Sequence, residues 1–120
     1  MTVETINPWT GAVEYRYEYF SDDEVERRLA AAARAYPAWA ALSFAERANY
    51  IRRTAVLLRE HRERLAGIIT AEMGKLRREA LAEIEKSAGA CEFYAGQAET
   101  YMQDKHIATE ASRSFVAYEP

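Results

Sequence analysis

The chain of 120 residues carries few side chains that could do covalent chemistry. Cys91 is its only cysteine, and a thiol becomes a nucleophile when a neighbouring base or cation favours the thiolate. His61 lies in a run of charged residues and His106 in a predicted loop, so the sequence places neither of them to serve as that base. We therefore predict that Cys91 is a buried structural residue. The two histidines are also too far apart to have the spacing of a zinc site.

Two further patterns resemble functional motifs without completing them. Glu83 and Glu85 are two positions apart, so on a helix they cannot share one face as a catalytic carboxylate pair. Gly74-Lys75 is similar to the end of a phosphate-binding loop, but the earlier glycine and the following Ser or Thr are missing. We assign no catalytic, cofactor-binding or metal-binding residue from the sequence.

The composition narrows the class of protein. Apolar residues make up 49% and charged residues 29% of the chain, which is ordinary for a soluble globular protein. A net charge of −3 lacks the basic surplus of a nucleic-acid-binding surface. No stretch approaches the ~20 apolar residues of a membrane span, and the first residues lack a signal-like apolar run. We expect a cytoplasmic protein with neither nucleic acid nor membrane as a partner.

The pattern of apolar residues predicts one segment, residues 1–120, with a mainly α fold. Residues 2–20 have the pattern of a β-hairpin, because a turn-rich Asn7-Pro8-Trp9-Thr10-Gly11 precedes a strand in which tyrosines alternate with polar residues. Residues 21–103 form the predicted helical region, with four to five helices. Residues 106–119 alternate again and predict a C-terminal strand.

Local signals divide the helical region. Ser21-Asp22-Asp23-Glu24 and Ser43-Phe44-Ala45-Glu46 both match the capping box that begins a helix. Pro37 is predicted to end or kink the first helix, which leaves Ala38–Leu42 as an apolar connection. The apolar stripe of the second helix lapses near His61, and this predicts a break there.

The Glu72-Met73-Gly74-Lys75 stretch is the junction on which the rest of the chain depends. Gly74 stands where a left-handed residue would end a helix, and Lys75 puts a cation beside the last carbonyl groups. The next predicted helix, over about residues 76–102, would be ~40 Å long, more than a globule of this size needs. We therefore expect it to be shared with a larger body. Its apolar face includes Ile84, Cys91, Tyr94 and Tyr101.

Several short motifs, in order along the chain, resemble the NAD(P)-dependent aldehyde dehydrogenases. They are Asn7-Pro8-Trp9-Thr10-Gly11, the small-residue run Ala31–Trp39, Ala45-Glu46-Arg47, Glu72-Met73-Gly74-Lys75, and Phe93-Tyr94-Ala95-Gly96. Residues 112–120 resemble the approach to the first core strand of the family's cofactor domain. The amino-acid sequences of residues 83–94 and 112–120 most resemble those of the succinate-semialdehyde dehydrogenase branch.

This resemblance implies the N-terminal part of the α/β aldehyde dehydrogenase fold, with helices on the cofactor domain and strands that join an oligomerisation sheet. A homo-oligomer is therefore expected. The family uses NAD or NADP, but its cofactor-binding and catalytic residues follow the equivalent of Pro120, so we expect no cofactor to be bound by this chain. Cys91 does not match the family's nucleophile. Some members hold a monovalent cation near the long helix, and counting back from Phe93-Tyr94-Ala95-Gly96 offers Glu85 for it.

The function implied is that of a non-catalytic N-terminal part of an enzyme that oxidises an aldehyde to an acid, with succinate semialdehyde the favoured substrate. The alternative is a free-standing helical module for self-association or interaction, left by a truncated gene or by proteolysis and without activity. An in-frame continuation beyond codon 120 would favour the enzyme, and a stop codon would favour the module.

Overall fold

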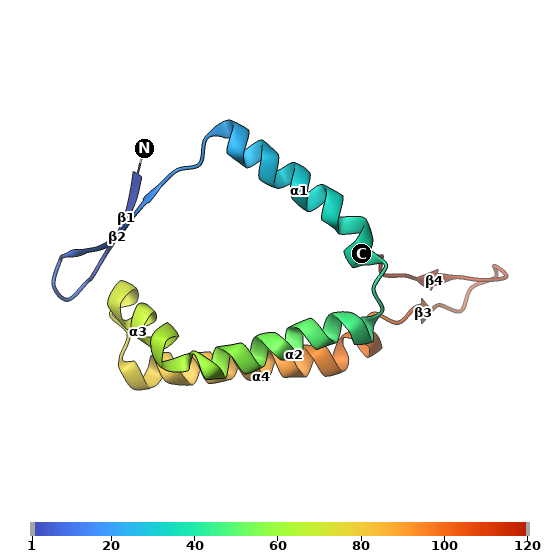
Figure 1. Cartoon of the computed structure of the whole chain (residues 1–120). Helices are drawn as coiled ribbons and strands as arrows, with labels where there is room; N and C mark the ends of the chain where they lie inside the picture. Colours follow the sequence, from blue (N-terminus) through green and yellow to red (C-terminus); the bar gives the residue numbers. More distant parts are fainter. Residues whose placement is uncertain (1, 120) are drawn as a thin grey trace.

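The computed structural model describes residues 2–119 as an open frame of helices with a small hairpin at each end (Figure 1). The predicted mainly helical fold with an N-terminal hairpin and a C-terminal strand is confirmed. In chain order the elements are β1 (Thr2–Ile6), β2 (Val13–Glu18), α1 (Asp22–Ala40), α2 (Phe44–Glu60), α3 (Arg62–Met73), α4 (Arg77–Tyr101), β3 (Lys105–His106) and β4 (Phe115–Val116).

The α2–α4 pair forms the body of the frame, with the two helices side by side and running in opposite directions (Figure 1). The apolar residues buried in the described part of the chain are almost all alanines: Ala48 and Ala55 from α2, Ala66 from α3, and Ala80, Ile84 and Ala88 from α4. Their spacing of four or seven residues keeps them on one face of each helix. Small side chains let the backbones approach closely, but they bury little apolar surface.

The junction at Gly74 has the predicted left-handed conformation. Gly74 has φ 67° and ψ 15°, and its N–H donates to the Thr70 carbonyl oxygen at 3.0 Å. The turn of the β1–β2 hairpin lies against it, so a Cβ atom on Gly74 would be 2.9 Å from Pro8 Cγ and 3.4 Å from Trp9 Nε1. Glycine is therefore needed here for its backbone conformation and for the close approach of the hairpin.

The predicted break between the second and third helices is also confirmed. α2 ends at Glu60, and His61 occupies a turn with φ −102° and ψ 11° before α3 begins at Arg62. α4 then covers nearly all of the predicted long helix.

The N-terminal hairpin pairs β1 with β2 in antiparallel register. Val3 lies opposite Tyr17 and Thr5 opposite Tyr15, which places these four side chains on one face. The other face carries an ion pair between Arg16 Nε and Glu4 Oε1 at 2.7 Å. The tyrosines remain about half exposed, so this face is not covered within the described chain.

One of the two predicted capping boxes is complete. At the start of α2 the Ser43 hydroxyl accepts from the Glu46 backbone N–H at 3.2 Å, and the Glu46 carboxylate accepts from the Ser43 N–H at 2.8 Å. At the start of α1 Ser21 accepts from the Glu24 N–H, but the Glu24 carboxylate pairs with two arginines one turn later, Arg27 and Arg28. These cations draw the carboxylate away from the Ser21 backbone, so the reciprocal half predicted there is wrong.

Pro37 is predicted from the sequence to end or kink the first helix. The helix does not end there, because α1 continues to Ala40, so the predicted connection Ala38–Leu42 is wrong. Proline removes one N–H and its ring crowds the carbonyl four residues earlier, which disfavours a helix at this point. The residues after Pro37 include two alanines, the strongest helix formers, and the Ala41 N–H donates to the Pro37 carbonyl at 3.1 Å. The connection to α2 is therefore residues 41–43, shorter than predicted.

The C-terminal strand predicted over residues 106–119 is much shorter in the structure. Only Phe115 and Val116 form β4, and they pair with a strand that the sequence did not predict, Lys105–His106. Between these strands the Thr109 hydroxyl bonds to Ser114 Oγ at 2.6 Å and accepts from the Ala111 N–H at 3.2 Å. Such side-chain bonds favour a turn over an extended ladder.

The frame is far more open than a folded protein of its mass. Its radius of gyration is 20.6 Å, whereas about 14 Å is expected for a compact domain of this length. It exposes 9625 Å², against about 6,600 Å² for a folded monomer of this mass. α1 lies apart from the α2–α4 pair and has no buried residue (Figure 1). These values support the expectation that the helices are built against a larger body.

Substitution of Gly74 tests the double constraint at the junction. Gly74→Ala should lower the free energy of unfolding by about 1–2 kcal/mol from the left-handed backbone, with a further loss because the new Cβ meets Pro8. Gly11→Ala is the matched control, since Gly11 has φ 71° but no atom within 4 Å of its Cβ position. Urea denaturation followed by circular dichroism measures both. Equal losses for the two variants would show that the hairpin does not press on Gly74.

Candidate functional site

An apolar groove of about 430 Å³ lies along the α2–α4 pair. Its walls combine residues of α2 and α4 with one residue from the end of α1, and nearly all of the lining is apolar. The lining residues are Trp39, Phe44, Arg47, Ala48, Ile51, Ala90, Cys91, Tyr94, Ala95 and Ala98. A groove with so few polar groups is suited to packing against apolar side chains and offers little to orient a polar substrate.

Cys91 lies in the wall of this groove and is half-buried. The prediction that Cys91 belongs to the apolar stripe of the long helix is therefore confirmed, but its burial is less complete than predicted. Burial is incomplete because the groove beside it is open. Tyr94, one turn further along α4, is 60% exposed on the same surface.

An ion-pair cluster of Arg59, Glu85 and Glu92 joins α2 to α4. Arg59 Nε donates to Glu85 Oε1 at 2.9 Å, and Arg59 Nη2 donates to Glu92 Oε2 at 2.9 Å. The two glutamates are seven residues apart, so they lie two turns apart on one side of α4. Hydrogen bonds from the arginine lower the pKa of Glu92, and bonds to Glu92 and then Glu85 raise the pKa of Arg59. The cluster fixes the register between the two helices.

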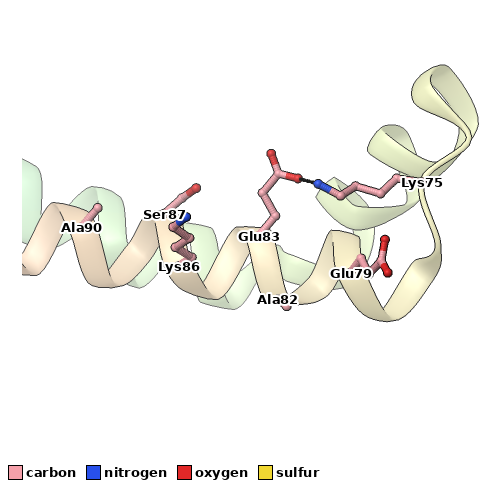
Figure 2. Close-up of a pocket in the computed structure, with 7 residues that line it drawn as sticks. All are labelled: Lys75, Glu79, Ala82, Glu83, Lys86, Ser87 and Ala90. Atoms are coloured by element: carbon pink, nitrogen blue, oxygen red, sulfur yellow. Dashed lines mark hydrogen bonds and ion pairs between the residues drawn. The ribbon is translucent and has the colours of Figure 1, made fainter.

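A second polar surface lies beside the Gly74 junction, over a shallow depression of about 690 Å³ (Figure 2). Lys75 reaches across to form an ion pair with Glu83, and Glu79, Lys86 and Ser87 project from neighbouring turns of α4. Two lysines and two glutamates balance the charge of this surface. The Lys75 ammonium is therefore already paired with the Glu83 carboxylate and is not free to bind a phosphate group.

The structure separates the residues that could have formed a nucleophile and base. His61 lies in the α2–α3 turn, His106 lies in β3 with its ring centroid 6.0 Å from that of Phe115, and Cys91 lies within α4. Within residues 2–119, no hydrogen bond links the Cys91 thiol to either histidine. The assignment of no catalytic residue to this chain stays a prediction.

The carboxylates considered for chemistry or cation binding are held by basic partners. Glu83 pairs with Lys75 and Glu85 with Arg59, so the two glutamates do face different groups. Over the described range 2–119, no three His, Cys, Asp or Glu side chains are grouped in a way that could hold a metal ion. The assignment of a cation to Glu85 is untested, and its carboxylate already accepts a bond from a guanidinium. Nor does any helix in that range have the length and apolar character needed to cross a bilayer.

Comparison with known proteins identifies the family to which this chain belongs. A sequence model of the aldehyde dehydrogenase family matches residues 1–120. The chain belongs to the aldehyde dehydrogenase family. It is 39% identical over 120 residues to a probable NADP-dependent succinate-semialdehyde dehydrogenase of Synechocystis sp., covering 100% of this chain and 26% of that protein. It is 33% identical over 116 residues to an NADP-dependent succinate-semialdehyde dehydrogenase of Deinococcus radiodurans, covering 97% and 24%.

The fold agrees with the same family. A crystal structure of succinic semialdehyde dehydrogenase from Streptococcus pyogenes in complex with NADP+ superimposes with a TM-score of 0.85 at 27% identity, covering 93% of this chain and 25% of that one. The chain thus spans about a quarter of the length of the curated relatives it matches, and the part that it matches is their N-terminal region. The motifs that suggested this aldehyde dehydrogenase family from sequence are confirmed.

The sequence analysis did not predict two features, the Arg59 ion-pair cluster and the apolar groove. Arg59 is 26 residues from Glu85 and 33 from Glu92, so only the antiparallel pairing of α2 with α4 brings them together. A usable signal existed in the spacing of the two glutamates, which places both on one side of a predicted helix. The groove was missed because its width depends on how closely the alanines let the helices approach.

Acid should weaken the α2–α4 pair. Because the pKa of folded Glu92 is lowered from the ordinary value of 4.5, its stabilising effect is complete above that value and is lost as the pH falls through the lowered pKa. We expect the melting temperature to drop between about pH 5 and about pH 3, and Glu92→Gln to melt lower at neutral pH with a smaller acid-induced drop. The pKa of Glu46 is also lowered, by its hydrogen bonds with Ser43. Some acid-induced drop in melting temperature should therefore persist in the Glu92→Gln variant.

Glu99→Gln is the matched control, since it removes the same charge from α4 at a position that forms no ion pair within the described chain. Circular dichroism at several pH values measures all three proteins. An acid-induced drop in Glu92→Gln as large as in the unmodified chain would show that the Arg59 cluster contributes nothing.

Proposed function

We propose that this chain is the N-terminal, non-catalytic part of an aldehyde dehydrogenase that oxidises succinate semialdehyde to the acid with NADP. The observation that carries the proposal is the identity of 39% and 33% to two NADP-dependent succinate-semialdehyde dehydrogenases over essentially the whole chain. In the reaction of such an enzyme, a thiolate attacks the aldehyde carbon and a bound nicotinamide accepts a hydride. Those groups are expected outside this chain.

The chain's own contribution is packing and assembly. Its exposed surface exceeds that of a compact protein of the same mass by about 3,000 Å², and the apolar groove lined by Ile51, Cys91 and Tyr94 is part of this excess. A catalytic body seated against the groove and against α1 would cover these side chains. The Glu83, Glu85 and Glu92 carboxylates of α4 are each paired with a basic side chain, which supports a structural role over a catalytic one.

The surface also supports a proposal of self-association in the complete protein. Tyr15 and Tyr17 on the hairpin and Phe115 and Val116 on β4 are all between 40% and 49% exposed. Both hairpins are two-stranded, so each presents unpaired backbone groups that another strand could bind. We propose a homo-oligomer located in the cytoplasm.

The activity is tested by reading the coding sequence beyond codon 120 and expressing the continuous product. We expect that product to form NADPH from succinate semialdehyde, measured by absorbance, at a higher kcat/KM than with betaine aldehyde or benzaldehyde. The purified chain of 120 residues should form none, and it serves as the control. A stop codon at position 121, or NADPH formation by the short chain alone, would overturn the proposal in favour of an independent module.

The exposed apolar surface predicts that the isolated chain of 120 residues associates. Light scattering at micromolar concentration should give a mass above the 13.7 kDa of one chain, because an interface of standard size would cover about 800 Å² on each partner. Tyr17→Glu places a charge on the hairpin's aromatic face, and Glu18→Lys is a control on its polar face. A clean monomer with cooperative melting would show that the exposed surface is tolerated.

A further inference from the structure

The corner between α1 and α2 contains an unusual helix cap. The last carbonyl groups of a helix lack internal partners and attract positive charge. α1 ends without a left-handed glycine and without a basic residue in its last turn, and its C-cap, Ala41, has a right-handed helical conformation with φ −73°. Any positive charge at this helix end must therefore come from outside the last turn of α1.

Arg47, in the first turn of α2, supplies it. Its Nη1 donates to the Leu42 carbonyl oxygen at 2.8 Å and lies 3.4 Å from the Ala40 carbonyl oxygen, and both bonds are partly buried. The guanidinium also stacks 4.7 Å above the centroid of the Phe44 ring. Partial burial reduces screening by solvent, so these bonds are stronger than those of an exposed arginine.

The direction of α1 depends on this corner because α1 has no packed face. None of its residues is buried, and the large apolar side chain of Leu29 is more than half exposed. Beside Arg47, the Trp39 ring at the end of α1 lies 5.5 Å from the Tyr50 ring of α2, centroid to centroid, at 60°. A connection of three residues, 41–43, would otherwise leave the helix free to swing.

We propose that Arg47 is a positioning residue: from α2 it binds the Leu42 carbonyl of the connection and the Ala40 carbonyl at the end of α1, and thereby fixes the direction of α1 relative to the α2–α4 pair. The same side chain lines one end of the apolar groove. Arg47 therefore sets how far the apolar face of α1 stands from the groove, and with it the space available to whatever packs between them. This inference concerns the chain itself and does not depend on the proposed enzyme activity.

Another arginine on α2 provides a matched control. Arg52 Nη2 donates to the Ala95 carbonyl oxygen at 3.4 Å, and Nη1 donates to Asn49 Oδ1 at 3.3 Å. Arg52 lies on α2, as Arg47 does, and it also donates to a backbone carbonyl. Its partner, however, lies on α4, and no bond from Arg52 to α1 is seen in the described chain. Loss of Arg52 removes one guanidinium without changing the corner.

The test measures distances between spin labels in the full chain. In a Cys91→Ser background, Glu26→Cys labels an exposed position on α1 and Lys86→Cys an exposed position on α4. Labelled chains are diluted with unlabelled chains so that contacts between copies do not contribute. We expect a narrow distribution for the parent protein, a broadened and shifted one after Arg47→Ala, and an unchanged one after Arg52→Ala. Arg47→Lys keeps the charge and should give partial recovery.

A second pair of labels, from Arg53→Cys on α2 and Lys86→Cys on α4, reports on the rest of the frame. This pair should keep its distance in the Arg47→Ala variant, which separates a swinging α1 from general unfolding. An unchanged α1–α4 distribution in Arg47→Ala would overturn the proposal. A broadened α2–α4 distribution together with a broadened α1–α4 distribution would also overturn it. Arg47 would then support the whole fold and not the direction of α1 alone.

Discussion

The rest of the structure depends on the close approach of α2 and α4 along a seam of alanines. Ala48, Ala55, Ala80 and Ala88 leave no bulk between the helices, so Arg59 can reach two glutamates on the opposite helix. The same small residues bury little apolar area, and the hydrophobic effect scales with area. The seam therefore sets the geometry of the frame more than it stabilises it. Larger apolar side chains such as Ile51 and Tyr94 remain beside the seam, available to an additional layer of protein.

Local chemistry could be predicted well from the sequence. The left-handed Gly74, the break at His61 and the capping box of Ser43 each depend on residues within a few positions of one another. Features that depend on chain segments brought together by folding could not be predicted. The Arg59 cluster and the pairing of β3 with β4 are of this kind. Family motifs filled part of this gap, because they imply an arrangement that periodicity alone does not contain.

The two errors in element boundaries have a common cause. At Pro37 a strong local rule predicted a helix end, but the alanines that follow and the contact of Trp39 with Tyr50 favour one more turn. In residues 106–119 an alternating pattern predicted a strand, but the hydroxyls of Thr109 and Ser114 bond locally and form a turn. In both cases a specific side-chain contact outweighed a pattern whose contribution per residue is small.

The electrostatic arrangement explains why this surface is built for packing. Glu83, Glu85 and Glu92 are each paired with a basic side chain, so these three carboxylates of α4 are neutralised before any partner arrives. Burying a neutralised pair at the edge of an interface costs less than burying a single charge. An additional layer of protein can then cover the apolar groove and α1 without leaving these three carboxylates unpaired, provided that the relative position of the groove and α1 is fixed. Arg47 provides that fixed position from the corner, which makes the open frame a defined template even though α1 itself has no core.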